Sequence, residues 1–152
     1  MIPKMNTDLK AQTIEESMLT RLREKGYKIT PQRREIISII AKDATHPRAA
    51  DILRKARSNA PHISVSTVYY SLALFKKEGL IREIEFYDMD NRYDTNTDDH
   101  LNLICLKCGT IEDFHGELPI SPQEVAQVAD FQPVRMRFEC YGYCSKCLKK
   151  QK

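Results

Sequence analysis

Several features that mark other protein classes are missing from this 152-residue chain. No apolar run approaches the ~18 residues that a membrane-spanning helix needs, so a membrane protein is not expected. Residues 1–16 lack the basic stretch followed by an apolar stretch that marks a signal peptide, so we expect a cytoplasmic protein. Internal repeats and low-complexity segments are also missing. The length then allows one ordinary globular domain or two small ones.

Cysteine is absent from the first two thirds of the chain. Four of the five cysteines form two C-x-x-C pairs, and in a cytoplasmic protein such pairs indicate metal binding or thiol redox chemistry. Four thiolates complete the tetrahedral shell of Zn²⁺, so we favour structural zinc over a thiol–disulfide switch or cysteines buried in the core. The expected zinc ligands are Cys105, Cys108, Cys144 and Cys147. Cys140 alternates with apolar residues, and we expect a small buried side chain there.

Positive charge is concentrated in the front of the chain. Residues 1–93 carry 17 Lys and Arg against 12 Asp and Glu, a net charge of +5, whereas residues 94–152 carry 7 against 9, a net charge of −2. A basic half suits a polyanionic partner such as nucleic acid, although a solvated basic surface would give the same count. Charge alone therefore does not decide between them.

The first half of the chain has helical periodicity. Apolar residues recur at helical spacing, between capping and stop residues, in four segments: residues 13–26, 30–43, 47–58 and 64–79. Residues 80–94 then read as two short strands around a turn. Helices followed by a β-hairpin predict a winged-helix domain, in which the helix before the hairpin enters the DNA major groove; the alternative is a small helical bundle.

The expected recognition helix has one apolar face. That face is formed by Val65, Val68, Leu72 and Phe75. Hydroxyl and aromatic side chains on the other faces can contact phosphates and base edges, and lysines suit the phosphate backbone. The residues expected to face outward or to lie at the edge of the apolar face are Ser66, Thr67, Tyr69, Tyr70, Ser71, Lys76 and Lys77.

The second half reads as a small α/β domain. Residues 100–105, 110–115 and 134–142 alternate as strands do, and residues 121–131 form a helix with a capping box. The fold class is therefore α+β, with a winged-helix domain over residues 1–90 and a second domain over residues 91–152. Because the second domain is so small, it buries only a small hydrophobic core. Metal binding or dimerisation would therefore have to stabilise it.

A His/Asp group accompanies the first cysteine pair. Strand alternation places His100 with Asn102 on one face, and Asp113 with His115 on one face of the next strand. With Asp94 they could bind Fe(II), Mn(II), Zn or Co, although single His and Asp residues are more often simply at the surface. His46 and His62 read as exposed residues.

Seven short motifs make the chain resemble the ferric uptake regulator (Fur) family of bacterial metal-dependent repressors. They are YKITPQRREII (27–37), HPRAADI (46–52), ISVSTVYYSL (63–72), FKKEGLI (75–81), RYDT (92–95), DHLNLICLKCG (99–109) and YGYCSKC (141–147). The resemblance, which runs from about residue 15 to residue 149, implies a winged-helix domain, a dimerisation domain, a homodimer on a palindromic DNA operator, and a regulatory metal between the domains. It also implies the four zinc cysteines, and DNA contacts at Arg33, Ser66, Thr67, Tyr69, Tyr70 and Lys76.

Within that family the chain is most similar to the peroxide-sensing PerR branch. The regulatory Fe(II) or Mn(II) ligands of that branch fall on His46, Asp94, His100, Asn102 and Asp113. The branch usually has His at the position of Asn102, and an amide oxygen is a weaker ligand, so we expect weaker Fe(II) binding with Mn(II) less affected. Relatives carry Arg or Asn at the position of Tyr70, so the resemblance does not predict which operator sequence this chain binds.

The implied function is a repressor rather than an enzyme. The metal would tie His46 to ligands near the hinge and hold the operator-binding form, until peroxide oxidises His46 or His100 and the metal leaves. One alternative is an iron- or manganese-responsive Fur-type repressor without peroxide sensing. A more distant alternative is a zinc-bound thiol-redox protein that uses its C-x-x-C pairs.

Overall fold

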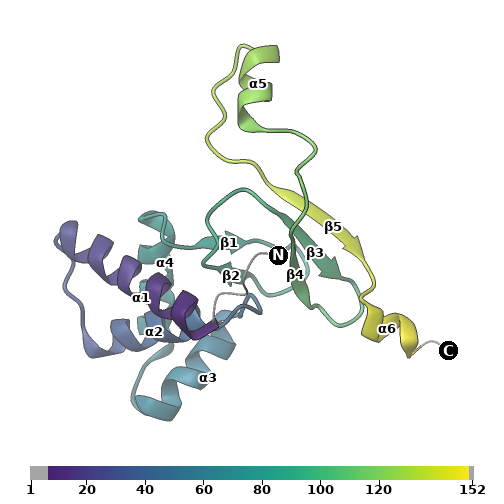
Figure 1. Ribbon diagram of the computed structural model, residues 1–152. Helices are drawn as coiled ribbons and strands as arrows, with labels where there is room; N and C mark the ends of the chain where they lie inside the picture. Colours follow the sequence, from purple (N-terminus) through teal and green to yellow (C-terminus); the bar gives the residue numbers. More distant parts are fainter. Residues whose placement is uncertain (1–6, 151–152) are drawn as a thin grey trace. The chain divides into compact units, whose positions relative to one another are not determined.

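The computed structural model describes residues 7–150 as two units, the first ending at Thr97 and the second beginning at Asp98 (Figure 1). Residues 1–6, part of the segment without signal-peptide features, lie outside the described residues. Within residues 7–150, no helix is both long enough and apolar enough to cross a membrane. The division falls after the hairpin, later than the expected 90/91 boundary, because the second hairpin strand pairs with the first.

The first unit contains the four expected helices. They are α1 (Thr7–Glu24), α2 (Pro31–Lys42), α3 (Ala49–Asn59) and α4 (Val65–Lys77). Two of them begin at side-chain caps: the N–H of Arg33 donates to Thr30 Oγ1 and the N–H of Thr67 donates to Ser64 Oγ, both at 3.1 Å. Each cap satisfies a backbone donor that the first helical turn leaves without a partner.

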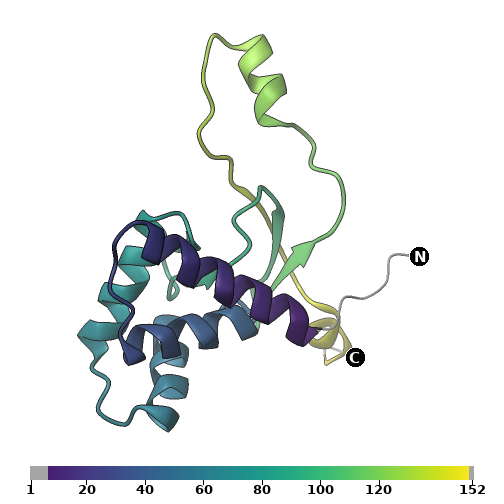
Figure 2. The same cartoon turned by 60° about the vertical axis from the view of Figure 1, so that its left-hand side comes forward.

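The core of this unit is made by apolar residues that recur at helical spacing. Figure 2 shows α1 lying along α2, and fully buried side chains include Leu22, Ile36, Ile52 and Phe75. Two expectations for α4 were wrong. Val65, in the first turn of the helix, is 48% exposed, and Ser71, one residue before the buried Leu72, is only 2% exposed.

A short hairpin completes the winged helix. Strands β1 (Arg82–Ile84) and β2 (Arg92–Asp94) pair antiparallel, with Glu83 opposite Tyr93. This hairpin is called the wing below. The turn between α2 and α3 lies against it, because Tyr93 N–H donates to the Pro47 carbonyl at 3.0 Å. A segment from the middle of the helical region is therefore fixed to the wing.

The second unit is a three-stranded sheet with two short helices. Its elements are β3 (Leu101–Cys105), β4 (Ile111–Phe114), α5 (Pro122–Val128), β5 (Phe138–Gly142) and α6 (Ser145–Lys149). The strand order is β4-β3-β5, with β3 antiparallel to β4 and parallel to β5. The β-β-α-β order was predicted, whereas α6 was not, and β5 and α5 are shorter than expected.

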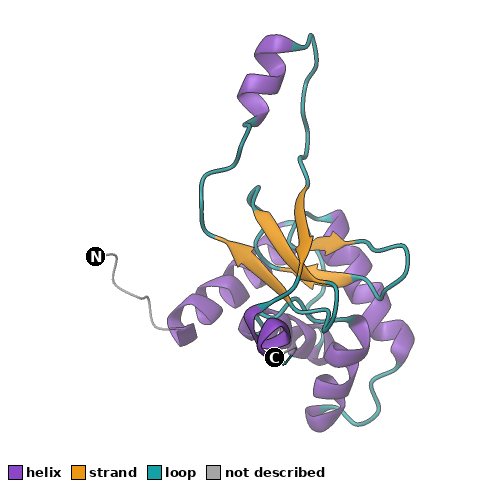
Figure 3. Cartoon of the chain, turned by 90° about the vertical axis from the view of Figure 1, so that its right-hand side faces the viewer, coloured by secondary structure: helices purple, strands orange, loops and turns teal. Residues whose placement is uncertain are grey.

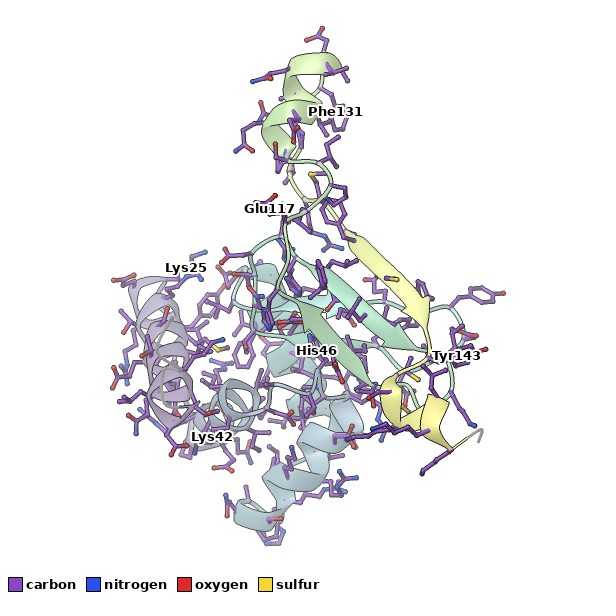
Figure 4. All side chains as sticks on the ribbon, turned by 45° about the vertical axis from the view of Figure 1, so that its right-hand side comes forward. Lys25, Lys42, His46, Glu117, Phe131 and Tyr143 are labelled. Atoms are coloured by element: carbon purple, nitrogen blue, oxygen red, sulfur yellow. The ribbon has the colours of Figure 1, made fainter. Side chains whose placement is uncertain are left out.

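Helix α5 has little contact with the rest of its unit. It has no buried residue and is joined to β4 and β5 by extended segments (Figure 3). Val128 is 90% exposed and Phe131, which Figure 4 labels beside α5, is 64% exposed. The buried part of this unit is therefore concentrated in the sheet and at the cysteines.

Candidate metal centres and nucleic-acid interface

The four cysteines of the C-x-x-C pairs meet in the second unit. Their sulfurs lie within 4.8 Å of one another, and Cys108 Sγ is 3.7 Å from Cys144 Sγ. Zn–S bonds of about 2.3 Å in a tetrahedron put sulfurs roughly 3.8 Å apart, whereas a disulfide needs about 2.05 Å. The donor set therefore fits a structural Zn²⁺ ion and does not fit a pair of disulfides.

Backbone hydrogen bonds build this site from the ends of two strands. Gly109, with φ of +72°, closes the turn after β3, and its N–H donates to the Cys105 carbonyl at 2.9 Å. The N–H of Leu106 donates to the Gly142 carbonyl at 2.8 Å, which ties the first knuckle to the end of β5. The parallel pairing of β3 with β5 thus brings the second cysteine pair to the first.

The thiols of this cluster have opposed acidities. Backbone N–H groups of Cys108 and Cys144 hydrogen-bond the Cys105 sulfur and lower the pKa of that thiol to about 6. Burial raises the pKa of Cys147 to about 12. One thiolate is thus available near neutral pH to bind a cation, and a bound Zn²⁺ would favour deprotonation of the others.

In the first unit, His46 and Asp94 form a buried pair. His46 Nε2 lies 3.3 Å from Asp94 Oδ2, and the two side chains are 4% and 8% exposed. The expectation that His46 is an exposed turn residue was therefore wrong, because the turn is fixed to β2. The other carboxylate oxygen, Asp94 Oδ1, accepts the N–H of Asn96 at 2.8 Å, which orients Oδ2 toward the imidazole.

In the second unit, His100 and Asp113 form a similar pair. His100 Nδ1 lies 2.8 Å from the Asp98 carbonyl, which can only accept, so this nitrogen carries a proton. The Nε2 atom, 3.3 Å from Asp113 Oδ1, is then the nitrogen that can offer a lone pair to a metal. Two acceptors facing each other need a cation, either a proton or a metal ion, between them.

Asn102 lies directly across the sheet from Asp113. The two residues are register partners on β3 and β4, and Asn102 is 7% exposed. Among the residues described, its Oδ1 atom is buried without a hydrogen-bond partner. Leaving a buried amide oxygen unsatisfied is unfavourable, and a bound cation would satisfy it. His115, which shares the face of Asp113 by alternation, lies beyond β4 and is exposed.

The expected DNA contacts lie in different environments. Tyr69 and Tyr70 are 55% and 70% exposed, and Ser66 is exposed beside a half-buried Thr67. Lys76 instead reaches the wing, where its Nζ lies 2.6 Å from Glu83 Oε2. Arg33 donates a hydrogen bond to the Lys28 carbonyl. Because these tyrosines are exposed, the start of α4 is accessible to a binding partner.

The sequence did not point to Arg92 or Thr110. Arg92 contacts residues 46 positions earlier, and no local pattern announces such a contact. Thr110, whose hydrogen bonds lower the pKa of Cys108, stands beside the knuckle without being part of its motif. Cys140 was expected to be buried but is exposed, because it lies on the edge strand β5.

Comparisons with known proteins indicate the family of the chain. The sequence model of the ferric uptake regulator family matches residues 24–141. The peroxide-responsive repressor PerR of Staphylococcus saprophyticus is 38% identical over 143 residues, covering 91% of this chain and 97% of the relative. The peroxide operon regulator of Bacillus subtilis is 39% identical over 142 residues, covering 93% and 97%.

A solved structure, the Helicobacter pylori ferric uptake regulator Fur with three functional metal binding sites, matches with a TM-score of 0.70. Its identity is 25%, and the match covers 91% of this chain and 93% of that one. Family match, sequence relatives and fold point the same way. The chain belongs to the ferric uptake regulator family and is a metal-dependent transcriptional regulator.

Proposed function

We propose that this protein is a cytoplasmic, homodimeric repressor that binds a palindromic operator and responds to peroxide through a regulatory Fe(II) or Mn(II) ion. The relatives named for a peroxide response, at 38% and 39% identity over nearly the whole chain, support the peroxide part of the proposal. The observation that carries it is the presence of two His–Asp pairs apart from the cysteine cluster, one buried and one partly buried.

The donor chemistry of these pairs supports a regulatory ion rather than a second structural zinc. Imidazole nitrogen and carboxylate oxygen suit Fe(II) and Mn(II) better than a soft thiolate set does. Each unit supplies only part of the four to six ligands that such an ion takes, so we propose that both pairs bind one ion. The proposed ligands are His46, Asp94, His100, Asn102 and Asp113.

When bound, Fe(II) would supply the electrons that activate peroxide beside the imidazoles. The residues then have two duties. His46 and His100 bind the ion and are the positions at which an oxygen atom would be added. Asp94 and Asp113 hold the imidazoles in place and supply negative charge, which favours a divalent cation over the empty site. Oxidation of either histidine would weaken binding and release the operator.

The exposed start of α4 supports the proposed DNA interface. Hydroxyls and tyrosine rings there can reach base edges and phosphates, with Ser66, Thr67, Tyr69, Tyr70 and Arg33 as the proposed contacts. Lys76 is paired with carboxylates of the wing, so it could contact a DNA phosphate only by leaving them. The exposed apolar residues around α5, such as Val128 and Phe131, support a second copy as the partner of this small unit.

The proposal is tested by operator binding under anaerobic conditions. Zinc-loaded protein is titrated onto candidate palindromic DNA with Mn(II) or Fe(II), before and after peroxide, and its peptides are analysed by mass spectrometry. We expect binding to require the added metal. Peroxide should abolish it only in the Fe(II) sample, with one oxygen atom gained on His46 or His100. His62→Ala, which alters an exposed histidine, serves as the control and should behave like the wild type.

The same experiment separates the alternatives. Metal-dependent DNA binding that survives peroxide without histidine oxidation would indicate an iron- or manganese-responsive repressor. Zinc loss with disulfide formation at low peroxide, and no metal-dependent DNA binding, would indicate a thiol-redox protein. Either result would overturn the peroxide-sensing proposal.

A further inference from the structure

The backbone at His46 has an unusual conformation. Its φ is +56°, and it is the one non-glycine residue with positive φ within residues 7–150. An L-residue is disfavoured in this left-handed region because its Cβ crowds the following carbonyl. Such a conformation persists when surrounding contacts determine it, and at a binding site it can be part of how the site is formed.

Arg92 supplies contacts at this turn. Its guanidinium donates from Nε to the His46 carbonyl and from Nη2 to the Thr45 carbonyl, the second at 3.1 Å. Two donors on one planar group fix the positions of two consecutive carbonyls, which a single ammonium could not do with the same geometry. The guanidinium is also partly buried, so these hydrogen bonds are partly shielded from water.

Strand β2, which carries Arg92, also contacts the His46 side chain. Asp94 follows Arg92 by two residues on β2, and alternation in a strand puts both side chains on one face. Arg92 therefore contacts the His46 carbonyl while Asp94 Oδ2 lies 3.3 Å from the imidazole Nε2. Two residues of β2 therefore hold His46: Arg92 contacts its backbone carbonyl and Asp94 contacts its imidazole ring.

We propose that Arg92 is a positioning residue, which holds His46 in its left-handed conformation and so presents the imidazole beside Asp94 for the regulatory ion. This inference rests on the proposed function, because it assigns His46 and Asp94 to that ion. Arg92 does not touch the metal. Its effect is to form this half of the site before the ion arrives, so that less ordering is needed on binding.

The turn has a second anchor that does not involve Arg92. Asp43 Oδ1 accepts the N–H of Thr45 at 2.9 Å, and Lys55 Nζ pairs with the other oxygen of Asp43. Tyr93 N–H also holds the Pro47 carbonyl. Loss of the Arg92 side chain should therefore release the His46 carbonyl while the turn and the unit stay folded.

The test compares Arg92→Gln and Arg92→Lys with the wild type as full-length, zinc-loaded protein. Mn(II) affinity is measured anaerobically by competition with a chromophoric chelator. We expect Arg92→Gln to bind Mn(II) about 10- to 100-fold more weakly, the range found when groups that orient a metal ligand are removed. Arg92→Lys, which keeps the charge but loses the planar fork, should recover only part of the loss.

A second readout follows the His46 backbone without any regulatory metal. Positive φ brings the amide proton close to its own Hα, so metal-free wild type should give a strong intraresidue NOE at His46. Arg92→Gln should lose that NOE. Asp94→Asn, which alters a proposed ligand, should lose Mn(II) affinity but keep the NOE. Arg54→Gln, at a 72% exposed arginine on α3, is the matched control and should change neither.

The outcomes are distinct. Arg92→Gln that binds Mn(II) as tightly as the wild type, or that keeps the NOE, overturns this inference alone. A wild type that binds neither Mn(II) nor Fe(II) removes the proposed function and the inference together. Zinc content and the unfolding temperature check that each variant is folded, and Arg92→Lys supplies the comparison if the glutamine variant is not.

Discussion

At the scale of single residues, Asn102 is the position where this chain departs most from the pattern it resembles. Its amide lies opposite Asp113 in the sheet and is almost fully buried, with an oxygen that has no hydrogen-bond partner among the described residues. A neutral oxygen donor at that position makes the proposed ligand set two nitrogens and three oxygens. Oxygen-rich sets discriminate less in favour of Fe(II) over Mn(II) than nitrogen-rich ones.

Asn102→His should therefore raise Fe(II) affinity more than Mn(II) affinity. We expect a gain for Fe(II) of about tenfold, or about 1.4 kcal/mol, because imidazole nitrogen replaces an amide oxygen. Anaerobic chelator competition measures both ions, with Asn59→His on α3 as the control for an added surface histidine. Equal Fe(II) affinities in wild type and variant would show that residue 102 is not a ligand.

The sequence pointed to the residues of both proposed metal sites but not to their surroundings. Two C-x-x-C pairs need only local spacing and tetrahedral chemistry to be recognised, and the structure brings those four sulfurs together. His46 was expected to be exposed because a His-Pro turn between helices has no local sign of burial. Its burial comes from β2, far along the chain, and Arg92 was overlooked for the same reason.

At the scale of elements, the wing is joined to the recognition helix by a cluster of polar side chains. Glu83 on β1 receives hydrogen bonds from Lys76 at 2.6 Å, Asn91 at 2.9 Å and Tyr93 at 3.2 Å. Burial alone would raise the pKa of Glu83, but the hydrogen bonds from Lys76 and Asn91 outweigh it and hold the pKa below its ordinary value. The ionised carboxylate thus fixes the wing against α4.

Glu83→Gln should destabilise the first unit by about 1 kcal/mol at neutral pH, since a charged hydrogen-bond acceptor is lost while Lys76 keeps Glu85. A carboxyl whose folded pKa is depressed stabilises the fold fully above its unfolded pKa, and this contribution disappears as pH falls through the folded value.

Thermal unfolding measured from neutral pH into acid should therefore show the wild-type advantage shrinking as pH falls below the ordinary carboxyl range. Glu85→Gln is the matched control, because Glu85 is 56% exposed and its pair with Lys76 is screened by water. A wild-type advantage over Glu83→Gln that is independent of pH would contradict this account.

Elements were predicted best where local signals were complete. The four helices of the first unit have apolar stripes within their own sequence, and α2, α3 and α4 lie within a few residues of their expected bounds, whereas α1 begins at Thr7, six residues before its expected start. Strand β5 was expected to begin at residue 134 but begins at Phe138. Its parallel pairing with β3 joins residues 37 positions apart, such as Leu101 and Phe138, and strand alternation alone does not specify a partner.

At the scale of the whole molecule, the two units differ in how they are stabilised. The main hydrophobic cluster lies entirely in the first unit, from Met18 to Tyr93. In the second unit, the buried apolar side chains among the described residues are Ile104, Ile111, Cys105 and Cys147. Two of those four are proposed zinc ligands, so metal binding replaces much of the missing core.

Removal of zinc should therefore unfold the second unit and spare the first. Structural zinc can contribute on the order of 10 kcal/mol to small metal-dependent folds, more than this sheet can replace. Hydrogen exchange of Cys108→Ser should show lost protection in β3 and β5 with protection retained in α2 and α4. Cys140→Ser should keep zinc and protection. A second unit that stays protected in Cys108→Ser would mean that zinc is dispensable for folding.

Strand β2 limits which changes of length the chain can accept. Arg92 and Asp94 act together only because one residue separates them, and the residue between, Tyr93, faces the opposite side to hydrogen-bond Glu83. A one-residue insertion or deletion within the strand would turn one of these side chains to the wrong face. Residues here can be substituted one at a time with graded effects, but a change in their number would disturb the wing and the ion site at once.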